Sequence, residues 1–549
     1  MPLLMALCVV AGILIGSFYT NHFSGNRLNI INTESNRLNN LLRIIDDQYV
    51  DSVNVNQLVE NAIPQILSEL DPHSVYISAK EVTTMNDDLK GSFFGIGIQF
   101  TIREDTIHVE DVIADGPAER AGIVAGDKIV EVDGKPFVGK KVTNQEAMAH
   151  LKGEKGTKVT VGIMSYGSKN VKRVTLTRDE IRTESVTASY MLDENTGYIK
   201  VKNFGENTYA ELLVALATLS QENLQNLVID LRDNTGGYMQ TAVQMANEFL
   251  PAKHLITYME GRRSPRKNFL SDGRGAYKTI PLVVLINEGS ASASEIFAGA
   301  IQDNDRGTII GRRSFGKGLV QQQISFPDAS MIRLTIARYY TPSGRCIQKP
   351  YKLGDGESYE QDLIERYKNG EYFSLDSIKH DGPEYHTTLG RKVYGGGGIT
   401  PDIFVAEDTS SMTSYYKKAV MTGLMMKYAY QYTDENRKTL SEYDDMPSLL
   451  KHLQRQNLVE KFAAFADKNG LKRRNLMIRQ SYVLLDRFIN ARVIYNILDE
   501  QALTEYLNLS DPVIENAKKV FAEGKAFPQK PAPKQVKNAN VKQQKAGRK

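Results

Sequence analysis

The chain has 549 residues, of which 41% are hydrophobic and 24% are charged, and its formal net charge is +3. This composition is typical of a globular protein with several domains of roughly 100–200 residues each. A charge so close to zero gives no reason to expect nucleic acid as a partner. The two cysteines, Cys8 and Cys346, are too few for a disulfide framework.

The N-terminal residues 1–20 contain the almost unbroken apolar run PLLMALCVVAGILIGSFY. Its length is near the lower limit for a membrane span, so it predicts a signal anchor or a signal peptide. No small-x-small cleavage site follows, and Leu7 before Cys8 is unlike a lipoprotein signal, which favours the anchor. The alternative, a buried core helix, is disfavoured because the run has no polar face. We therefore expect the rest of the chain to be exported.

Residues 27–90 show helical spacing of apolar side chains, as in Leu38, Leu41, Leu42 and Ile45, and predict an N-terminal helical region. The pattern changes between residues 91 and 180. Short β runs such as GSFFGIGIQF, DKIVEVDG and TKVTVGIM are separated there by glycine turns, with one helix near 144–151. This segment predicts a compact β-rich module.

Residues 185–406 alternate strands and helices, in the order TGYIKVKNF, AELLVALATLS, NLVIDLR, TAVQMANEFL, PLVVLIN, SEIFAGAIQ, GTIIG and SMIRLTIARYY. Such alternation predicts an α/β core with a partly parallel sheet. Residues 411–525 are helical in pattern, most clearly in YYKKAVMTGLMMKYAYQY and SYVLLDRFINARVIYNIL. The last segment, 526–549, is rich in lysine and contains no acidic residue, so we expect a disordered basic tail.

Ser292 lies in the stretch GSASASEIF. The preceding PLVVLIN predicts a buried strand and the following ASEIFAGAIQ a helix, so Ser292 is placed at a strand-to-helix junction. Its neighbours Ala291 and Ala293 are small, and a helix N-terminus offers unpaired N–H groups to an oxyanion. This arrangement suits a nucleophile, although serine is also a favoured N-cap and many serines at such junctions only cap.

A serine nucleophile needs a base, and no histidine lies in this segment; the nearest in sequence is His254. Lys317, in the sequence FGKG, is the alternative. Its glycine neighbours allow it to turn inward, and burial disfavours its charged form. A lysine that binds phosphate or carboxylate is the competing interpretation, but FGKG lacks the full Gly-x-x-x-x-Gly-Lys-Ser/Thr pattern.

SASASEI followed by FGKGLVQ, with Lys317 25 positions after Ser292, resembles the carboxyl-terminal processing peptidases, also called tail-specific proteases. The resemblance extends over about residues 41–406. GIGIQF and ERAGIVAGDKIVEVDG resemble the family's PDZ domain, LVIDLRDNTGG its glycine loop, and YYTPSGRCIQ and GGGGITPDI its later core signatures. It implies an α/β multidomain protein, with a spiral crotonase/ClpP-like protease core, an inserted PDZ domain and flanking helical regions.

The resemblance implies the roles of the site residues, which are transferred to this sequence position by position. Ser292 is the nucleophile, Lys317 the general base and Gln321 the glutamine that orients it, and the oxyanion hole is formed by the N–H groups of Ala293 and of Gly236 or Gly237. Glu295 and Asp303 have supporting roles, since acidic residues at such positions more often cap a helix or pair with arginine than react. The chain departs from the family at Arg312-Arg313-Ser314, where Glu-Pro-Thr is frequent, which puts in question the contacts of this loop.

The resemblance also implies how substrates are selected. In a PDZ domain, a glycine-containing loop binds a terminal carboxylate through backbone N–H groups while the peptide adds as a strand. Gly95, Ile96, Gly97 and Ile98 supply that loop, and Ile96, Ile98 and Met148 are expected to line the pocket for an apolar last side chain. The competing interpretation is that Ile96 and Ile98 are core residues.

The implied partners are proteins with free, apolar C-termini, and we expect no cofactor, no metal and no nucleic acid. The expected location is the bacterial cell envelope: anchored in the inner membrane with the bulk in the periplasm, or released to the periplasm after cleavage. A homo-oligomer through the helical regions is also expected. Two other functions compete with a serine endopeptidase: an inactive PDZ scaffold, which the intact Ser292 and Lys317 disfavour, and an acyl-CoA enzyme of crotonase-like fold, which has no use for a PDZ module.

Overall fold

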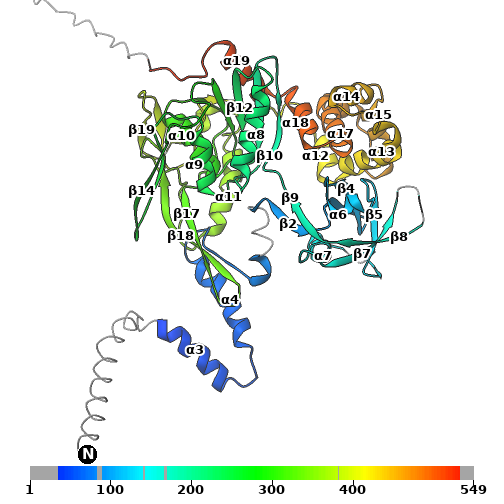
Figure 1. Cartoon of the computed structure of the whole chain (residues 1–549), viewed down its shortest axis with the longest axis horizontal. Coiled ribbons are helices and arrows are strands. Elements are labelled where there is room, and N and C mark those ends of the chain that lie inside the picture. The colour runs from blue at the N-terminus through cyan, green and yellow to red at the C-terminus, as the bar shows by residue number, and fades with distance from the viewer. Residues whose placement is uncertain are drawn as a thin grey trace, which may run out of the picture. The chain divides into compact units, whose positions relative to one another are not determined.

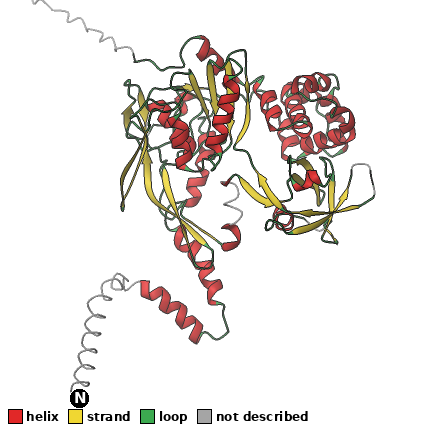
Figure 2. Cartoon of the chain, viewed as in Figure 1, coloured by secondary structure: helices red, strands yellow, loops and turns green. Residues whose placement is uncertain are grey.

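The computed structural model describes residues 35–82, 90–139, 142–165, 168, 170–380 and 382–531 (Figures 1 and 2). The chain divides into two compact units, residues 1–71 and 72–549. In the first unit, α3 (Ser35–Gln48) is followed by α4 (Val55–Ser68), whose N-terminus is capped by the Asn54 side chain. None of the described helices combines the length and apolarity needed to cross a membrane. The apolar run at residues 1–20 lies outside the described residues.

The β-rich module has a sheet in the order β3 (Ile98–Arg103), β4 (Thr106–Val112), β5 (Lys128–Val132), β7 (Lys158–Met164) and β8 (Lys172–Thr177), with β6 (Lys135–Pro136) beside β5. Its helices are α6 (Pro117–Arg120) and α7 (Asn144–Leu151). A capping box between Thr143 and Glu146 starts α7, at the position that the sequence pattern predicts. In the described part of the sheet, β3 is an edge strand, because β4 is its only partner.

The chain enters and leaves this module through two neighbouring strands. β2 (Ser92–Gly95) pairs antiparallel with β9 (Asp179–Arg182). Immediately outside this ribbon, the N–H of Thr183 donates to the carbonyl of Gly91 at 3.0 Å. The two ends of the module are therefore adjacent.

The α/β core is built on a six-stranded sheet. Its order is β10 (Val186–Met191), β11 (Thr196–Val201), β12 (Asn226–Asp230), β15 (Leu282–Ile286), β16 (Thr308–Gly311) and β21 (Ile403–Phe404). All neighbours from β11 to β21 are parallel, whereas β10 is antiparallel to β11. The partly parallel sheet is thus as the alternating pattern predicts.

Helices cover both faces of this sheet (Figure 1). α8 (Thr208–Ser220), α9 (Met239–Asn247) and α10 (Ala293–Asp303) share one core with Ile199, Leu227 and Val284. α19 (Pro512–Ala522) packs on the other face, against Val228 and Val283. Since successive strand residues point to opposite faces, the apolar run PLVVLIN serves both cores.

A second sheet lies beside the first. β18 (Met331–Tyr340) pairs with β1 (Val75–Ile77), with β13 (Leu255–Gly261) and with β17 (Leu319–Ser325), while β14 (Ser264–Leu270) pairs with β13. β1 falls in the segment that the sequence pattern describes as helical, and it is a strand because β18 offers it an edge. Residues 349–395 contain α11 (Gly356–Lys368), a 3-10 turn η2 (Leu375–Ser377) and the hairpin of β19 (Glu384–His386) and β20 (Lys392–Tyr394), none of which the sequence pattern predicts.

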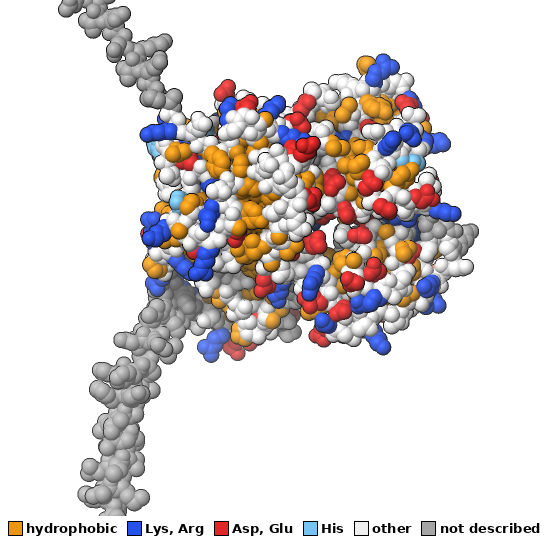
Figure 3. Space-filling view, turned by 45° about the horizontal axis from the view of Figure 1, so that its top comes forward, with side chains coloured by type: hydrophobic (Ala, Val, Ile, Leu, Met, Phe, Trp, Pro, Cys, Tyr) orange, Lys and Arg blue, Asp and Glu red, His pale blue; other side chains and the backbone are white. Residues whose placement is uncertain are grey.

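The C-terminal helices form a separate apolar core around Phe462, Leu485 and Ile489. They are α12 (Ser414–Met421), α13 (Leu424–Leu440), α14 (Met446–Leu453), α15 (Leu458–Lys468), α16 (Asn475–Gln480), α17 (Tyr482–Ile497) and α18 (Glu500–Asn508). The run YYKKAVMTGLMMKYAYQY makes two helices instead of one, because Gly423 adopts a φ of 69°. On the face drawn in Figure 3, basic and acidic side chains are interspersed, as is usual for a solvated surface.

Candidate active site

Three loops line one cleft of about 1050 Å³. One follows β15 and carries Ser292, one follows β12 and carries Gly236 and Gly237, and the third precedes β17 and carries Lys317. β12 and β15 are parallel neighbours, so their carboxyl ends meet at the same edge of the sheet. The structure therefore brings together residues that the sequence places up to 81 positions apart.

Ser292 has a backbone conformation that is rare for a residue with a side chain, with φ of 57° and ψ of −113°. Hydrogen bonds hold this turn on both sides: the N–H of Ser292 donates to Glu295 Oε2 at 2.9 Å, and its carbonyl accepts from the Glu295 N–H at 2.9 Å. Strained backbone of this kind persists only where its surroundings impose it. Here it places Ser292, half-buried, at the first turn of α10 beside the cleft.

Glu295 is completely buried and joins the serine loop to the lysine loop. Its carboxylate accepts from the N–H groups of Ser292 (2.9 Å), Gly316 (2.8 Å) and Lys317 (2.9 Å), and from the hydroxyl of Ser314. Burial raises the pKa of Glu295 to about 7, against the opposing effect of these four donors. Its supporting role is therefore to hold two loops through one carboxylate.

Tyr339 ties the same two loops from the β18 side. Its hydroxyl lies within hydrogen-bond distance of two backbone carbonyls, those of Ser292 (3.0 Å) and Lys317. The ring is buried, and burial raises the pKa of Tyr339 well above its usual value, so the hydroxyl keeps its proton and remains a donor. Nothing in the strand sequence SMIRLTIARYY distinguishes Tyr339 from its neighbour Tyr340 except the alternation of the strand.

The glycine loop decides which backbone N–H groups are available to an oxyanion. Asn234 is fully buried, and its Oδ1 accepts from the N–H of Gly236 at 2.9 Å. Among the described residues, the N–H groups of Ala293 and Gly237 have no hydrogen-bond acceptor. Of the two glycines that the sequence leaves open, Gly237 is therefore the one that can serve with Ala293.

Gly236 allows the glycine loop to approach the serine. A Cβ atom built on Gly236 would lie 2.8 Å from Ser292 Cβ and 3.0 Å from the Ala293 nitrogen, and its φ is +105°. We expect Gly236→Ala to lower kcat by about 10²-fold or more, since the added Cβ would push Ser292 and the Ala293 N–H away from the glycine loop, and these N–H groups are the ones expected to bind an oxyanion. Gly470→Ala, also at positive φ but with open space around it, controls for backbone strain. Peptide hydrolysis at saturating substrate is the measurement, and a Gly236→Ala enzyme as fast as Gly470→Ala would contradict this placement.

Gln321 and Asp303 are also expected to have roles in the site, but only Gln321 lies at the cleft. Gln321, on β17, lines the cleft, and its amide donates to the carbonyl of His73 at 3.2 Å. Asp303, at the end of α10, is buried away from the cleft lining and pairs with the guanidinium of Arg345 at 2.7 Å. The role of Asp303 is therefore to fix the end of α10.

In the β-rich module, the side chains of Ile96 and Ile98 are buried in the core, with 2% and 9% of their surfaces exposed. This agrees with the interpretation that they are core residues. The carbonyl groups of Ile96 and Gly97 accept from Ala118 (2.8 Å) and Ile113 (3.1 Å), which fixes the loop between β2 and β3. Met148, half-buried on α7, is the member of the expected pocket whose side chain retains exposed surface.

Three segments match models of known families: residues 82–164 a PDZ domain, residues 195–355 peptidase family S41, and residues 415–499 a family of unknown function. The carboxy-terminal-processing protease of Bartonella bacilliformis is 37% identical over 347 residues, which cover 61% of this chain and 79% of that protein. The carboxy-terminal processing protease CtpB of Bacillus subtilis is 34% identical over 309 residues, covering 56% and 64%.

Among solved structures, the photosystem II D1 C-terminal processing protease is 26% identical, with a TM-score of 0.35, over 68% of this chain and 94% of that chain. A PDZ domain of the carboxy-terminal protease from Vibrio cholerae, solved with a peptide, is 30% identical over 17% of this chain and 98% of that chain, with a TM-score of 0.16. The family models and the protein relatives agree on one assignment. The chain belongs to peptidase family S41, the carboxyl-terminal processing peptidases, and is a serine-type peptidase with a PDZ domain.

Proposed function

We propose that this protein is an exported serine endopeptidase that recognises C-terminal tails through its PDZ domain and cleaves the protein upstream with a Ser292–Lys317 dyad. One observation carries the proposal. Ser292, Lys317 and the glycine loop line the same cleft, and Glu295 binds the backbones of both dyad residues. Gln321 lines that cleft as well and is proposed to orient the lysine.

In the proposed reaction, the neutral amine of Lys317 accepts the proton of the Ser292 hydroxyl while Oγ bonds to the carbonyl carbon of the substrate. The negative charge that develops on the carbonyl oxygen is bound by the N–H groups of Ala293 and Gly237. The C–N bond then breaks, and the lysine ammonium gives its proton to the departing amine. Water hydrolyses the acyl-enzyme by the same steps, with Lys317 taking a proton from water and returning it to Ser292.

The proposed function also implies a fold for the catalytic core and a place for the PDZ domain within it. We propose that the core is the spiral crotonase/ClpP-like fold and that the PDZ domain is inserted into it. The parallel order from β11 to β21 supports the first point. The second is supported by β1, which precedes the PDZ domain in sequence and yet pairs with β18 of the core.

Two features support delivery of a tail from the PDZ domain to the cleft. β3 has a strand partner on one side only in the described part of the sheet, so a peptide can add on its other side as a strand, next to the loop of Gly95–Ile98. Of the three residues between β9 and β10, which join the PDZ domain to the core, Thr183 and Glu184 line the catalytic cleft. A bound tail and the scissile bond are therefore served by adjoining parts of the chain.

We expect cleavage to depend on the carboxylate of the substrate tail. One unstructured protein with an apolar C-terminus is compared with the same protein amidated there; the amide should lower kcat/KM by about tenfold or more, because a hydrogen bond to a charged group is lost. The change is made in the substrate because a Cβ on Gly97 would lie 3.0 Å from Ile181 Cδ1 and disturb the loop. Equal rates for the two substrates would show that the carboxylate is not recognised.

The peptidase proposal is tested by labelling with a fluorophosphonate, followed by peptide mapping. A label on Ser292, together with degradation of an unstructured protein that has an apolar tail, supports the endopeptidase. A scaffold or an acyl-CoA enzyme would give neither result.

Location and assembly are proposed from the sequence. Residues 1–20 are proposed to anchor the protein in the inner membrane with its bulk in the periplasm. Membrane fractionation, followed by an assay of protease accessibility, tests this location.

Self-association is proposed through the N-terminal helices. The side chains of Leu38, Leu41 and Ile44 on α3 are exposed, which supports a homo-oligomer formed there. Light scattering of the full chain and of a Leu38→Ser/Leu41→Ser variant tests it.

A further inference from the structure

Residues 349–395 form an excursion from the core whose two ends meet. After Gln348 the chain leaves the core, and it returns where the N–H groups of Gly396 and Gly398 donate to the carbonyls of Cys346 and Ile347, each at 2.8 Å. The excursion carries α11, η2, β19 and β20. Its described residues, 349–380 and 382–395, contribute no strand to the six-stranded sheet, and none of them lines the catalytic cleft.

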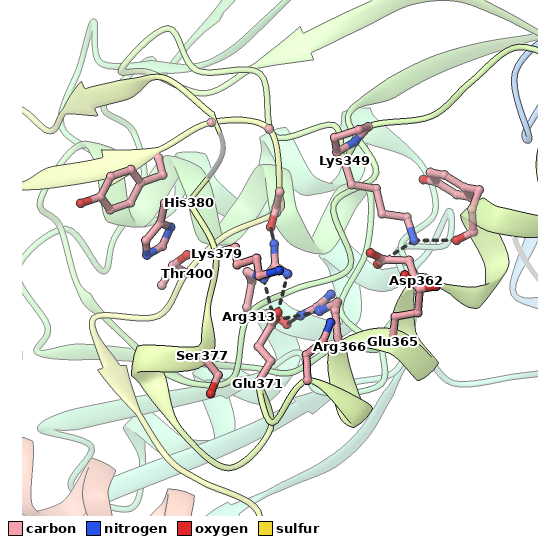
Figure 4. A pocket seen from close by; sticks show the side chains of 18 of the residues that line it. Arg313, Lys349, Asp362, Glu365, Arg366, Glu371, Ser377, Lys379, His380 and Thr400 are labelled. Atoms are coloured by element: carbon pink, nitrogen blue, oxygen red, sulfur yellow. Dashed lines mark hydrogen bonds and ion pairs between the residues drawn. The ribbon is translucent and has the colours of Figure 1, made fainter.

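The excursion contacts the loop that carries Lys317 through a buried cluster of charges (Figure 4). Arg366, in the last turn of α11, donates from Nη1 to the carbonyl of Ser314 (3.0 Å) and from Nη2 to the carbonyl of Arg313 (2.8 Å). Its Nε donates to Glu371 Oε1 at 2.8 Å. One guanidinium thus fixes two consecutive carbonyl groups just before the sequence FGKG.

Glu371 links the two arginines of the cluster. Its two oxygens accept from Nε and Nη2 of Arg313, each at 2.6 Å, and one of them also accepts from Arg366. Arg313 in turn donates to the carbonyl of Gly397 at 2.9 Å, where the excursion rejoins the core. Arg366 and Glu371 are each 5% exposed, and a buried pair of this kind depends on both partners. The arginine that departs from the family pattern at position 313 has its partner in the excursion.

Ser314 connects this cluster to the catalytic residues. Its carbonyl accepts from Arg366, while its hydroxyl donates to Glu295, whose carboxylate holds the N–H groups of Ser292 and Lys317. The ring of the next residue, Phe315, is covered by the ammonium of Lys349, 4.1 Å from the ring centre. The lysine loop is therefore held by Glu295 of α10 and also by the excursion.

We propose that the excursion at residues 349–395 is a clamp that sets the position of the lysine loop, with Arg366 as its positioning residue. The proposal rests on the role proposed for Lys317. Arg366 touches neither substrate nor the reacting atoms; it acts through Ser314 and Glu295. Because a misplacement of about 1 Å at a reacting group can cost about 10²-fold in rate, the clamp governs kcat and not the binding of the tail.

The test compares Arg366→Met with Lys368→Met in the full chain. Lys368 lies in the same turn of α11 but is exposed. We expect Arg366→Met to lower kcat and the rate of fluorophosphonate labelling together, by about 10- to 100-fold, with KM within about twofold of the wild type. Lys368→Met should match the wild type. Unchanged kcat in a folded Arg366→Met protein would overturn the clamp.

A double-mutant cycle separates positioning from general stabilisation. If Arg366 acts through Glu295, the losses in kcat caused by Arg366→Met and Glu295→Gln will not add, whereas independent structural effects will. If the single variant fails to fold because Glu371 keeps only one of its two arginine partners, the variant Arg313→Met/Arg366→Met/Glu371→Met removes all three charges together. A folded triple variant with wild-type kcat would equally overturn the proposal.

Lys317→Ala in the same series distinguishes this proposal from the dyad. If Lys317→Ala still turns over while Arg366→Met is slow, the dyad fails and the excursion still positions the serine through Glu295. If Lys317→Ala is inactive while Arg366→Met is as fast as the wild type, the dyad stands and the clamp fails.

Discussion

Ser292→Ala and Lys317→Ala will each lower kcat for peptide hydrolysis by about 10⁴-fold or more. In the proposed dyad, Ser292 supplies the atom that bonds to the substrate and Lys317 accepts the serine proton, so the reaction needs both residues. Removing both should cost about as much as removing either, because the two act as one unit. Single-turnover hydrolysis of an unstructured tailed substrate, at one pH near neutrality, measures all three variants.

Lys317→Arg sharpens this expectation. A guanidinium stays protonated at every accessible pH and cannot accept the serine proton, so the variant should be as inactive as Lys317→Ala although it keeps a long side chain that ends in nitrogen. Lys352→Ala, at an exposed lysine, is the matched control and should leave kcat unchanged. Appreciable turnover by Lys317→Ala or Lys317→Arg would exclude the lysine as the base.

Glu295→Gln should lower kcat by about 10²- to 10³-fold. The carboxylate accepts four hydrogen bonds, whereas the amide has one accepting oxygen and turns two N–H donors toward groups that also donate. Each buried donor without an acceptor costs about 1–3 kcal/mol, which the loops avoid by moving apart. Glu222→Gln, at an exposed position, should behave as the wild type. A fully active Glu295→Gln enzyme would show that the four bonds do not position the dyad.

The same substitution has a pH signature. The folded protein holds the Glu295 proton up to about pH 7, while the unfolded chain releases it near 4.5. Between these values unfolding releases a proton, so wild-type stability falls as pH rises, by about 3 kcal/mol over the whole window. Glutamine does not titrate. The thermal midpoint of Glu295→Gln minus that of the wild type should therefore rise from pH 4.5 to pH 7 and stay level above pH 7. A difference that is constant between pH 4.5 and 7 would contradict this.

The strands and helices of the core that have a strong apolar period are predictable from the sequence, as PLVVLIN and SEIFAGAIQ show. Strands such as β1 and β17 are not, because they are short or exposed and depend on the edges of β18. The elements of the excursion are also not predictable from the pattern of apolar residues. They are held by buried charged groups, whose partners lie up to 58 positions apart in the sequence, and not by an apolar period.

In the site, the resemblance of the sequence motifs to the family points to Ser292, Lys317 and the glycine loop, and the structure places all three at one cleft. The choice between Gly236 and Gly237 depends on the Asn234 side chain, whose orientation no sequence pattern gives. Likewise, Glu295 in the first turn of a helix reads as a capping residue. Its contacts with Gly316 and Lys317, 21 and 22 positions away, exist only because the lysine loop folds back over α10.

The ribbon of β2 and β9 bears on how such an enzyme acquires new substrates. Gly91 and Thr183, on either side of the PDZ domain, are already hydrogen-bonded neighbours. A different domain with adjacent termini could therefore take the place of residues 92–182 while Gly91 and Thr183 stay neighbours. On the proposed function, recognition of the tail and cleavage of the substrate are thus separable traits, and selection can change the first while the second stays constant.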